Sequence, residues 1–134
     1  MILKHAMIAL FVCMLSLVAC GQSEQEKRAF DALEQVRSAV SSGVNYQRFS
    51  DLVSEATAAM SRLPRDGRTY GELSSCMASY QSAKDNWTDS LPRFIRGEPS
   101  AVDDGSLIPD WRRANCHLNN AYAIINGGAP KECE

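Results

Sequence analysis

Apolar residues recur every three or four positions along four stretches of the chain, and polar residues fill the positions between them. This spacing places the apolar side chains of each stretch on one face of an α-helix. It predicts helices over residues 24–42, 46–63, 70–91 and 110–126. No stretch alternates apolar and polar residues as a half-buried strand does, and no segment is repeated. The predicted fold class is therefore all-α.

Residues typical of helix N-termini precede three of these stretches. Ser23 with Glu26, and Thr69 with Glu72, fit the capping box, in which the hydroxyl accepts the backbone N–H three residues on and the glutamate reaches back. Asn45 is a favourable N-cap for the second helix. We therefore expect helices to begin immediately after these three capping residues.

The connections between the predicted helices are short, short and long. Residues 42–45 leave room only for a tight connection, so the first two helices are expected to form an antiparallel hairpin. Pro92 is expected to end the third helix, and the 92–109 loop separates it from the fourth, which Gly127 and Gly128 close. This order predicts a small up-down-up-down four-helix bundle.

A different kind of segment precedes the bundle. Residues 6–19 are 14 uncharged residues after Lys4, too few to cross about 30 Å of hydrocarbon as a helix, so we interpret them as a cleaved signal peptide. Leu17-Val18-Ala19-Cys20 at its end, followed by Gly21, resembles the lipobox of bacterial lipoproteins. That resemblance implies cleavage before Cys20 and lipidation of its thiol. The alternative is an ordinary secretory signal in which Cys20 is incidental.

The lipoprotein interpretation divides the chain into a signal peptide (1–19), a lipidated tether (20–22) and a helical domain (23–134). A single acyl chain binds a membrane only marginally, whereas two or more anchor a protein stably. The resemblance therefore implies a permanent attachment to a membrane of the cell envelope through Cys20. In the lipobox pattern an aspartate after the cysteine retains the protein in the inner membrane, so Gly21 favours the periplasmic face of the outer membrane.

Cleavage would leave 115 residues, the size of one domain. Loss of Lys4 leaves 13 basic against 16 acidic side chains, a net charge of −3 that argues against a nucleic-acid partner, because such proteins usually carry a basic face. Only His117 remains of the two histidines, which excludes sites with several histidine ligands. No cofactor or metal is expected.

Three cysteines remain beyond Cys20, an odd number for an oxidising compartment. Cys76 falls within the apolar face of the third helix, whereas Cys116 lies about 160° from Leu118, on the back of the fourth. We expect a disulfide between Cys116 and Cys133 on the C-terminal tail, with Cys76 as a buried thiol. A Cys76–Cys116 bond is the alternative.

Candidate catalytic groups have no supporting pattern. Cys116 and His117 are neighbours on a helix and point about 100° apart, and the spacing of the cysteines and His117 fits no zinc module. His117 is expected on the solvated surface, and Asp103 and Asp104 lack a carboxylate-pair pattern. We therefore expect a protein that is not an enzyme.

The turn between the second and third helices carries Arg62, Arg65 and Arg68. Two antiparallel passes return this turn to the anchored end of the bundle. The arginines are expected either to be simply solvated or to contact anionic lipid headgroups, which contribute about 1 kcal/mol per basic residue.

The 92–109 loop is expected at the opposite end and contains Arg93, Phe94, Ile95 and Arg96. One interpretation is a lid in which Phe94 and Ile95 fold back over the core. The other is a binding loop in which these two residues contact an envelope partner and the two arginines form a polar rim.

The expected function is therefore that of a non-enzymatic envelope lipoprotein that presents a helical bundle to another envelope component. Val44-Asn45-Tyr46 together with Tyr80, Ala83 and Trp87 is similar to small exported bacterial helical proteins, a resemblance that implies no activity. The alternative is a bundle that binds a small apolar ligand in a cavity among four aromatic residues, Tyr80, Trp87, Trp111 and Tyr122.

Overall fold

The structure is a computed structural model that describes residues 22–134, so the predicted signal peptide and the predicted lipidation site at Cys20 lie outside the described residues. This part of the chain forms four α-helices and no strand: α2 (Glu24–Ser42), α3 (Tyr46–Met60), α4 (Tyr70–Ile95) and α5 (Ile108–Ile125). The predicted all-α, four-helix bundle is confirmed. None of the described helices is long and apolar enough to cross a membrane.

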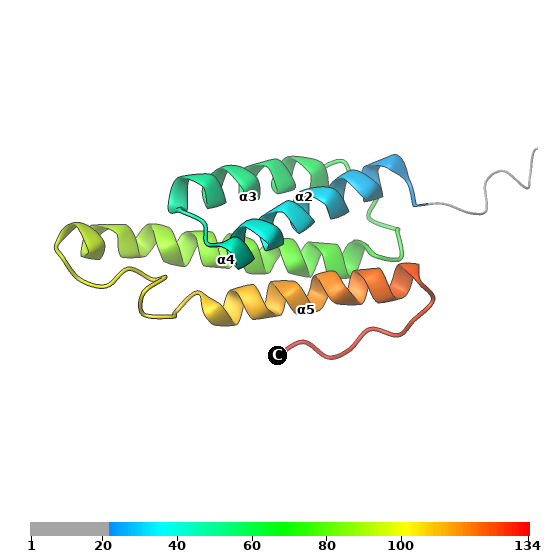
Figure 1. Ribbon diagram of the computed structural model, residues 1–134. Helices are drawn as coiled ribbons and strands as arrows, with labels where there is room; N and C mark the ends of the chain where they lie inside the picture. The colour runs from blue at the N-terminus through cyan, green and yellow to red at the C-terminus, as the bar shows by residue number, and fades with distance from the viewer. Residues whose placement is uncertain (1–21) are drawn as a thin grey trace, which may run out of the picture.

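Successive helices run antiparallel, and the α2–α3 hairpin packs across the α4–α5 pair (Figure 1). The start of α2, the α3–α4 turn and the end of α5 therefore share one end of the molecule, which we call the base (residues 22–25, 61–69 and 126–128). The α2–α3 turn and the α4–α5 loop with the first residue of α5 share the other end, which we call the tip (residues 43–45 and 92–108). The up-down-up-down order follows directly.

Aromatic rings fill the middle of the bundle. The ring of Phe49 lies 5.5 Å from that of Trp87, 6.2 Å from that of Trp111 and 6.4 Å from that of Tyr80, measured between centroids. Trp87 and Trp111 are 6.3 Å apart. Such edge-on and tilted pairs stabilise a core by about 0.5–1.5 kcal/mol beyond the area that they bury. One cluster of rings thus joins α3, α4 and α5.

Two of the three predicted N-caps form as expected. The side chain of Ser23 accepts the N–H of Glu26 at 3.1 Å, and that of Asn45 accepts the N–H of Arg48 at 2.9 Å. The cap at Thr69 was a wrong prediction, because this residue makes no side-chain cap bond. Its backbone is already helical (φ −94°, ψ −7°), whereas an N-cap residue is extended, so its hydroxyl is buried without a partner.

Helix α4 continues past Pro92, contrary to the prediction that this proline ends it. Proline removes one backbone donor, and Thr88 four residues earlier is exposed, so water can hydrogen-bond its carbonyl oxygen. The helix ends instead at Ile95 and is closed by Gly97, which has φ +82°. Glu98 N–H and Gly97 N–H bond the carbonyls of Arg93 and Phe94 at 3.1 and 2.9 Å, the usual closure of a glycine-capped helix.

Three other helix ends differ from the prediction: α3 ends three residues earlier, α5 begins two residues earlier, and α5 ends one residue earlier. Helix α3 ends at Met60, after which a tighter turn keeps Leu63 buried through the bond of its N–H to the Met60 carbonyl at 3.1 Å. Helix α5 begins at Ile108, because Pro109 lies in the first turn, where the missing N–H has no partner to lose. At its other end Gly127 (φ +76°) closes α5 as expected.

Candidate functional site

Exposed apolar side chains gather at the tip. Among the described residues five large apolar side chains are exposed, and four of them belong to the end of α4, the following loop and the start of α5: Phe94 (57%), Ile95 (84%), Val102 (39%) and Ile108 (50%). Single exposed apolar residues are common on protein surfaces, but a group at one place marks an interaction site. The tip is therefore the candidate functional site.

Phe94 and Ile95 are exposed because α4 extends beyond the other three helices at the tip (Figure 1). Their last helical turn has no neighbouring helix against which to bury an apolar side chain. The lid interpretation was therefore wrong for these two residues. Ala101 and Leu107, which are 2% and 0% exposed, close this end of the core instead.

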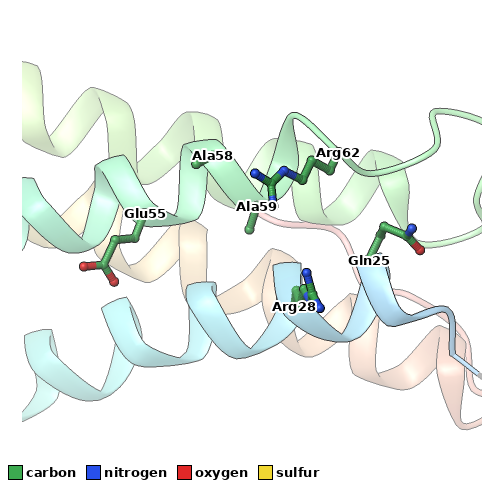
Figure 2. A pocket seen from close by; sticks show the side chains of 6 residues that line it. All are labelled: Gln25, Arg28, Glu55, Ala58, Ala59 and Arg62. Atoms are coloured by element: carbon green, nitrogen blue, oxygen red, sulfur yellow. The ribbon is translucent and has the colours of Figure 1, made fainter.

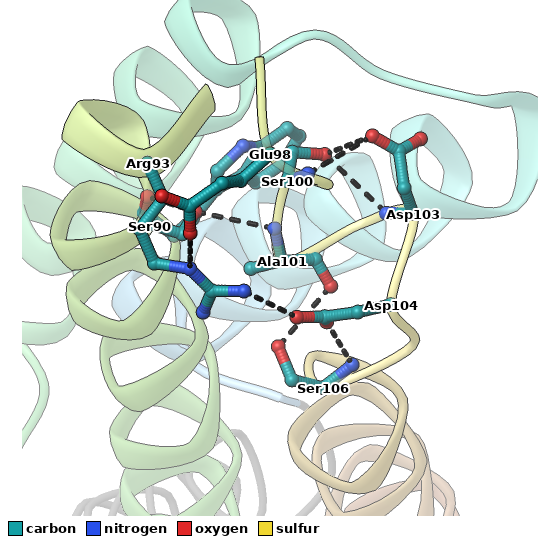
Figure 3. Close-up of polar contacts among 9 residues, drawn as sticks. Ser90, Arg93, Glu98, Ser100, Ala101, Asp103, Asp104 and Ser106 are labelled. Carbon is teal, nitrogen blue, oxygen red and sulfur yellow. Dashed lines mark hydrogen bonds and ion pairs between the residues drawn. The ribbon is translucent and has the colours of Figure 1, made fainter. Parts of the chain in front are cut away.

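The loop that follows α4 is held by polar bonds to the helix (Figure 3). The Ser90 hydroxyl accepts the Ala101 N–H at 3.2 Å. Arg93 forms ion pairs with Glu98 at 3.3 Å and with Asp104 at 3.6 Å. These bonds join the last turns of α4 to both halves of the loop, so the loop is an ordered support for the exposed residues.

Two aspartates order the loop from within. Hydrogen bonds from the hydroxyl and the N–H of Ser100, at 2.7 and 3.1 Å, lower the pKa of Asp103 below its ordinary value. The N–H of Ser106, at 2.9 Å, lowers the pKa of Asp104 in the same way. Both carboxylates therefore accept hydrogen bonds from the loop in their ionised form at neutral pH.

The arginines beside the exposed residues are neutralised by their own loop. Arg96 pairs with Glu98 at 3.1 Å, and Arg93 pairs with Glu98 and Asp104. The charges of Arg93 and Arg96 are thus balanced by Glu98 and Asp104, and a polar rim around a bound partner stays a prediction. Sequence reasoning missed these two acidic partners, which follow only from the path of the loop.

The arginines of the α3–α4 turn lie at the base, where the up-down order had placed them. Arg62, Arg65 and Arg68 are all exposed, and none of them forms an ion pair within residues 22–134. Their contact with lipid headgroups remains a prediction.

The predicted disulfide is present. Cys116 and Cys133 are bonded, with their Cα atoms 5.7 Å apart, and the free Cys76 is fully buried. Burial raises the pKa of the Cys76 thiol to about 12, so it is neutral and unreactive at physiological pH. Asn120 also holds the tail, because its side chain accepts the Lys131 N–H at 2.8 Å and donates to the Lys131 carbonyl at 2.7 Å.

His117 was wrongly expected to be a solvated surface residue. Its Nδ1 lies 2.7 Å from a carboxylate oxygen of Glu72, and its side chain is only 19% exposed. Glu72 thus contacts α5 instead of completing a capping box with Thr69. Glu72, His117 and Cys133 bring their donor atoms within 4.8 Å of one another, yet the disulfide leaves Cys133 without a thiolate, so the group lacks the ligand set of a metal site.

The four aromatic residues proposed to surround a ligand are divided between two places. Tyr80, Trp87 and Trp111 pack with Phe49 in the core. The fourth residue, Tyr122, is 37% exposed and contacts Phe30 with ring centroids 4.8 Å apart. The arrangement offers this alternative no support, and binding of an apolar ligand stays a prediction.

Comparison of the chain with protein-family models, with curated proteins and with solved structures found no match. The fold defines the molecule as a small disulfide-bonded α-helical bundle.

Proposed function

We propose that this protein is a non-enzymatic lipoprotein of the cell envelope that is anchored through Cys20 and binds another envelope component with its tip. The observation that carries the proposal is the concentration of exposed apolar side chains at the end opposite the start of α2. A tether of two residues, 21 and 22, would hold the base within about 10 Å of the lipid surface. Helix α4, with 26 residues, spans about 40 Å, so it would display the tip well away from that surface.

The chemistry of the tip indicates the kind of partner. Phe94 and Ile95 project from a helix end that is held by ordered polar bonds, so little conformational entropy is lost when they are buried. The charges around them are balanced, which does not favour a strongly charged partner. The tip suits an apolar groove on a protein, with Phe94 as the central anchor.

The experiment that tests the binding role compares the lipidated protein with its Phe94→Ser/Ile95→Ser variant. Each is crosslinked in native membranes, and the same covalent partner is quantified in both. We expect the crosslink to be lost in the variant and kept in Tyr122→Ser, which removes the one large exposed apolar side chain away from the tip among residues 22–134. Equal crosslinking of all three proteins would reject the tip as a binding site.

The variant must also remain folded. Phe94 has about 43% and Ile95 about 16% of its surface buried, and full burial of such side chains contributes about 1.5–3 kcal/mol each. The double substitution should therefore lower the unfolding free energy by less than about 2 kcal/mol. A larger loss in urea unfolding would mean that these residues stabilise the bundle, and the binding role would lose its basis.

The anchor is tested separately with Cys20→Ala. Without its thiol the protein cannot be lipidated, so we expect release from the membrane fraction or accumulation of the unprocessed chain. A variant that is still processed and still sediments with the membranes after a high-salt wash would reject the lipoprotein proposal.

A further inference from the structure

A groove of about 500 Å³ runs between α2 and α3 at the base (Figure 2). Ala58 and Ala59 on α3, which have short side chains, line part of it. Longer polar side chains border it: Gln25, Arg28, Glu55 and Arg62. None of these residues belongs to the core, and none is used by the tip.

The charges of the groove are arranged along its length. Arg62 extends over Ala59, and Arg28 on α2 lines the same groove (Figure 2). Glu55 on α3 lies seven residues before Arg62, which belongs to the α3–α4 turn, so it is about two helical turns closer to the tip. The groove therefore has a basic end at the base of the bundle and an acidic end toward its middle.

Both arginines are available to bind an anion. Arg62 forms no ion pair with any residue of the described chain, and Arg28 pairs only with Glu24 at 3.3 Å. The side chains of that pair are 62% and 69% exposed, so solvent screens it and an incoming anion can replace it. The planar guanidinium group forms paired hydrogen bonds with phosphate oxygens, and the Gln25 amide adds a donor.

We propose that this groove binds the phosphate group of a membrane phospholipid headgroup. The inference rests on the proposed attachment at Cys20, which would place the basic end of the groove beside the lipid surface. Glu55 restricts which headgroups can bind, because its carboxylate repels a second anionic group at the acidic end of the groove. The site therefore suits a phosphodiester headgroup whose far end is neutral or cationic, rather than a polyphosphate.

The test uses residues 22–134 without lipid, because the whole buried core lies between Ala29 and Ala121. Binding to phosphatidylcholine vesicles that contain phosphatidylglycerol is measured by co-sedimentation. We expect Arg28→Gln/Arg62→Gln to bind at least about tenfold more weakly. The control, Arg48→Gln/Arg112→Gln, removes the same charge from two exposed arginines in the first two turns of α3 and α5, near the tip, and should change binding by less than about twofold.

A second variant predicts a gain. Glu24→Gln frees Arg28 from its ion pair and should strengthen vesicle binding while the helical circular dichroism signal stays unchanged. If the Arg28/Arg62 and Arg48/Arg112 substitutions weaken vesicle binding equally, binding depends on net charge alone and the inference is overturned. Absence of vesicle binding by the wild-type protein, or no gain in Glu24→Gln, would overturn it as well. A titration with inorganic phosphate, monitored through the backbone amide chemical shifts of Gln25 and Arg62, tests the other source of this group. Saturation of the groove by phosphate alone would assign the site to soluble phosphate instead. Because this protein carries no lipid and no changed tip residue, these outcomes are independent of the tests of anchoring and tip binding.

Discussion

Removing the disulfide provides a quantitative test of how the C-terminal tail stabilises the bundle. Cys116→Ser/Cys133→Ser opens a loop closed by residues 17 apart in sequence. A crosslink over a loop of about this length lowers the entropy of the unfolded chain enough to contribute about 3 kcal/mol. Since domains of this size have unfolding free energies of about 5–15 kcal/mol, the variant should still fold but be clearly less stable.

The hydrogen bonds of Asn120 make the test more specific. With the disulfide intact, Asn120→Ala removes two bonds to Lys131, which each contribute about 1 kcal/mol. In the double serine variant the tail can leave α5, so Asn120→Ala should lower the unfolding free energy by much less. A double-mutant cycle of Asn120→Ala with and without the disulfide therefore measures whether the two contacts hold the tail together.

Urea unfolding followed by the helical circular dichroism signal supplies each free energy. Reduction of the wild-type protein with a dithiol should reproduce the loss seen in the double serine variant, because Cys76 forms no disulfide. A loss below about 1 kcal/mol, or identical costs of Asn120→Ala in both backgrounds, would refute the conclusion that the tail is held as one unit.

Three further predictions concern buried groups. Thr69→Val replaces a partnerless hydroxyl and should raise the unfolding free energy by up to about 1 kcal/mol, whereas loss of a helix cap would lower it. Burial raises the pKa of Cys76, so the thiol ionises at a lower pH in the unfolded chain than in the folded protein. The unfolding free energy measured in urea should therefore be kept below about pH 9 and fall as the pH rises toward about 12. The fall should be smaller in Cys76→Ala. Asp110 accepts bonds from Ser82 and Asn86 at 3.0 Å, so Asp110→Ala should cost about 1–3 kcal/mol in the same assay, and no loss would contradict this role.

Local chemistry was enough to predict most helix positions. The caps at Ser23 and Asn45 act within three residues, so their geometry depends on little beyond the neighbouring sequence. The disulfide was also predictable, because Cys116 lies off the apolar face of α5 and a short tail after Gly127 can reach it. These features depend on periodicity and short-range reach, which a sequence displays directly.

Pro92 shows where local rules failed. The sequence contains two signals for the end of α4, the proline and Gly97, and local propensity does not decide between them. The exposed position of the helix decides, because water can satisfy the carbonyl that Pro92 leaves without a donor, and the glycine then closes the helix. The end of α4 in turn determines whether Phe94 and Ile95 belong to a loop or to a projecting helix.

The sequence by itself determined the all-α class, the order of the helices, their apolar faces and the residues of the candidate tip. Only the tertiary structure decided which of those residues are free. Exposure of Phe94 depends on the unequal reach of four packed helices, and the pairing of Glu72 with His117 depends on how α4 and α5 face each other across 45 residues of sequence. Such contacts depend on the relative placement of whole elements, which hydrophobic periodicity along a single helix does not specify.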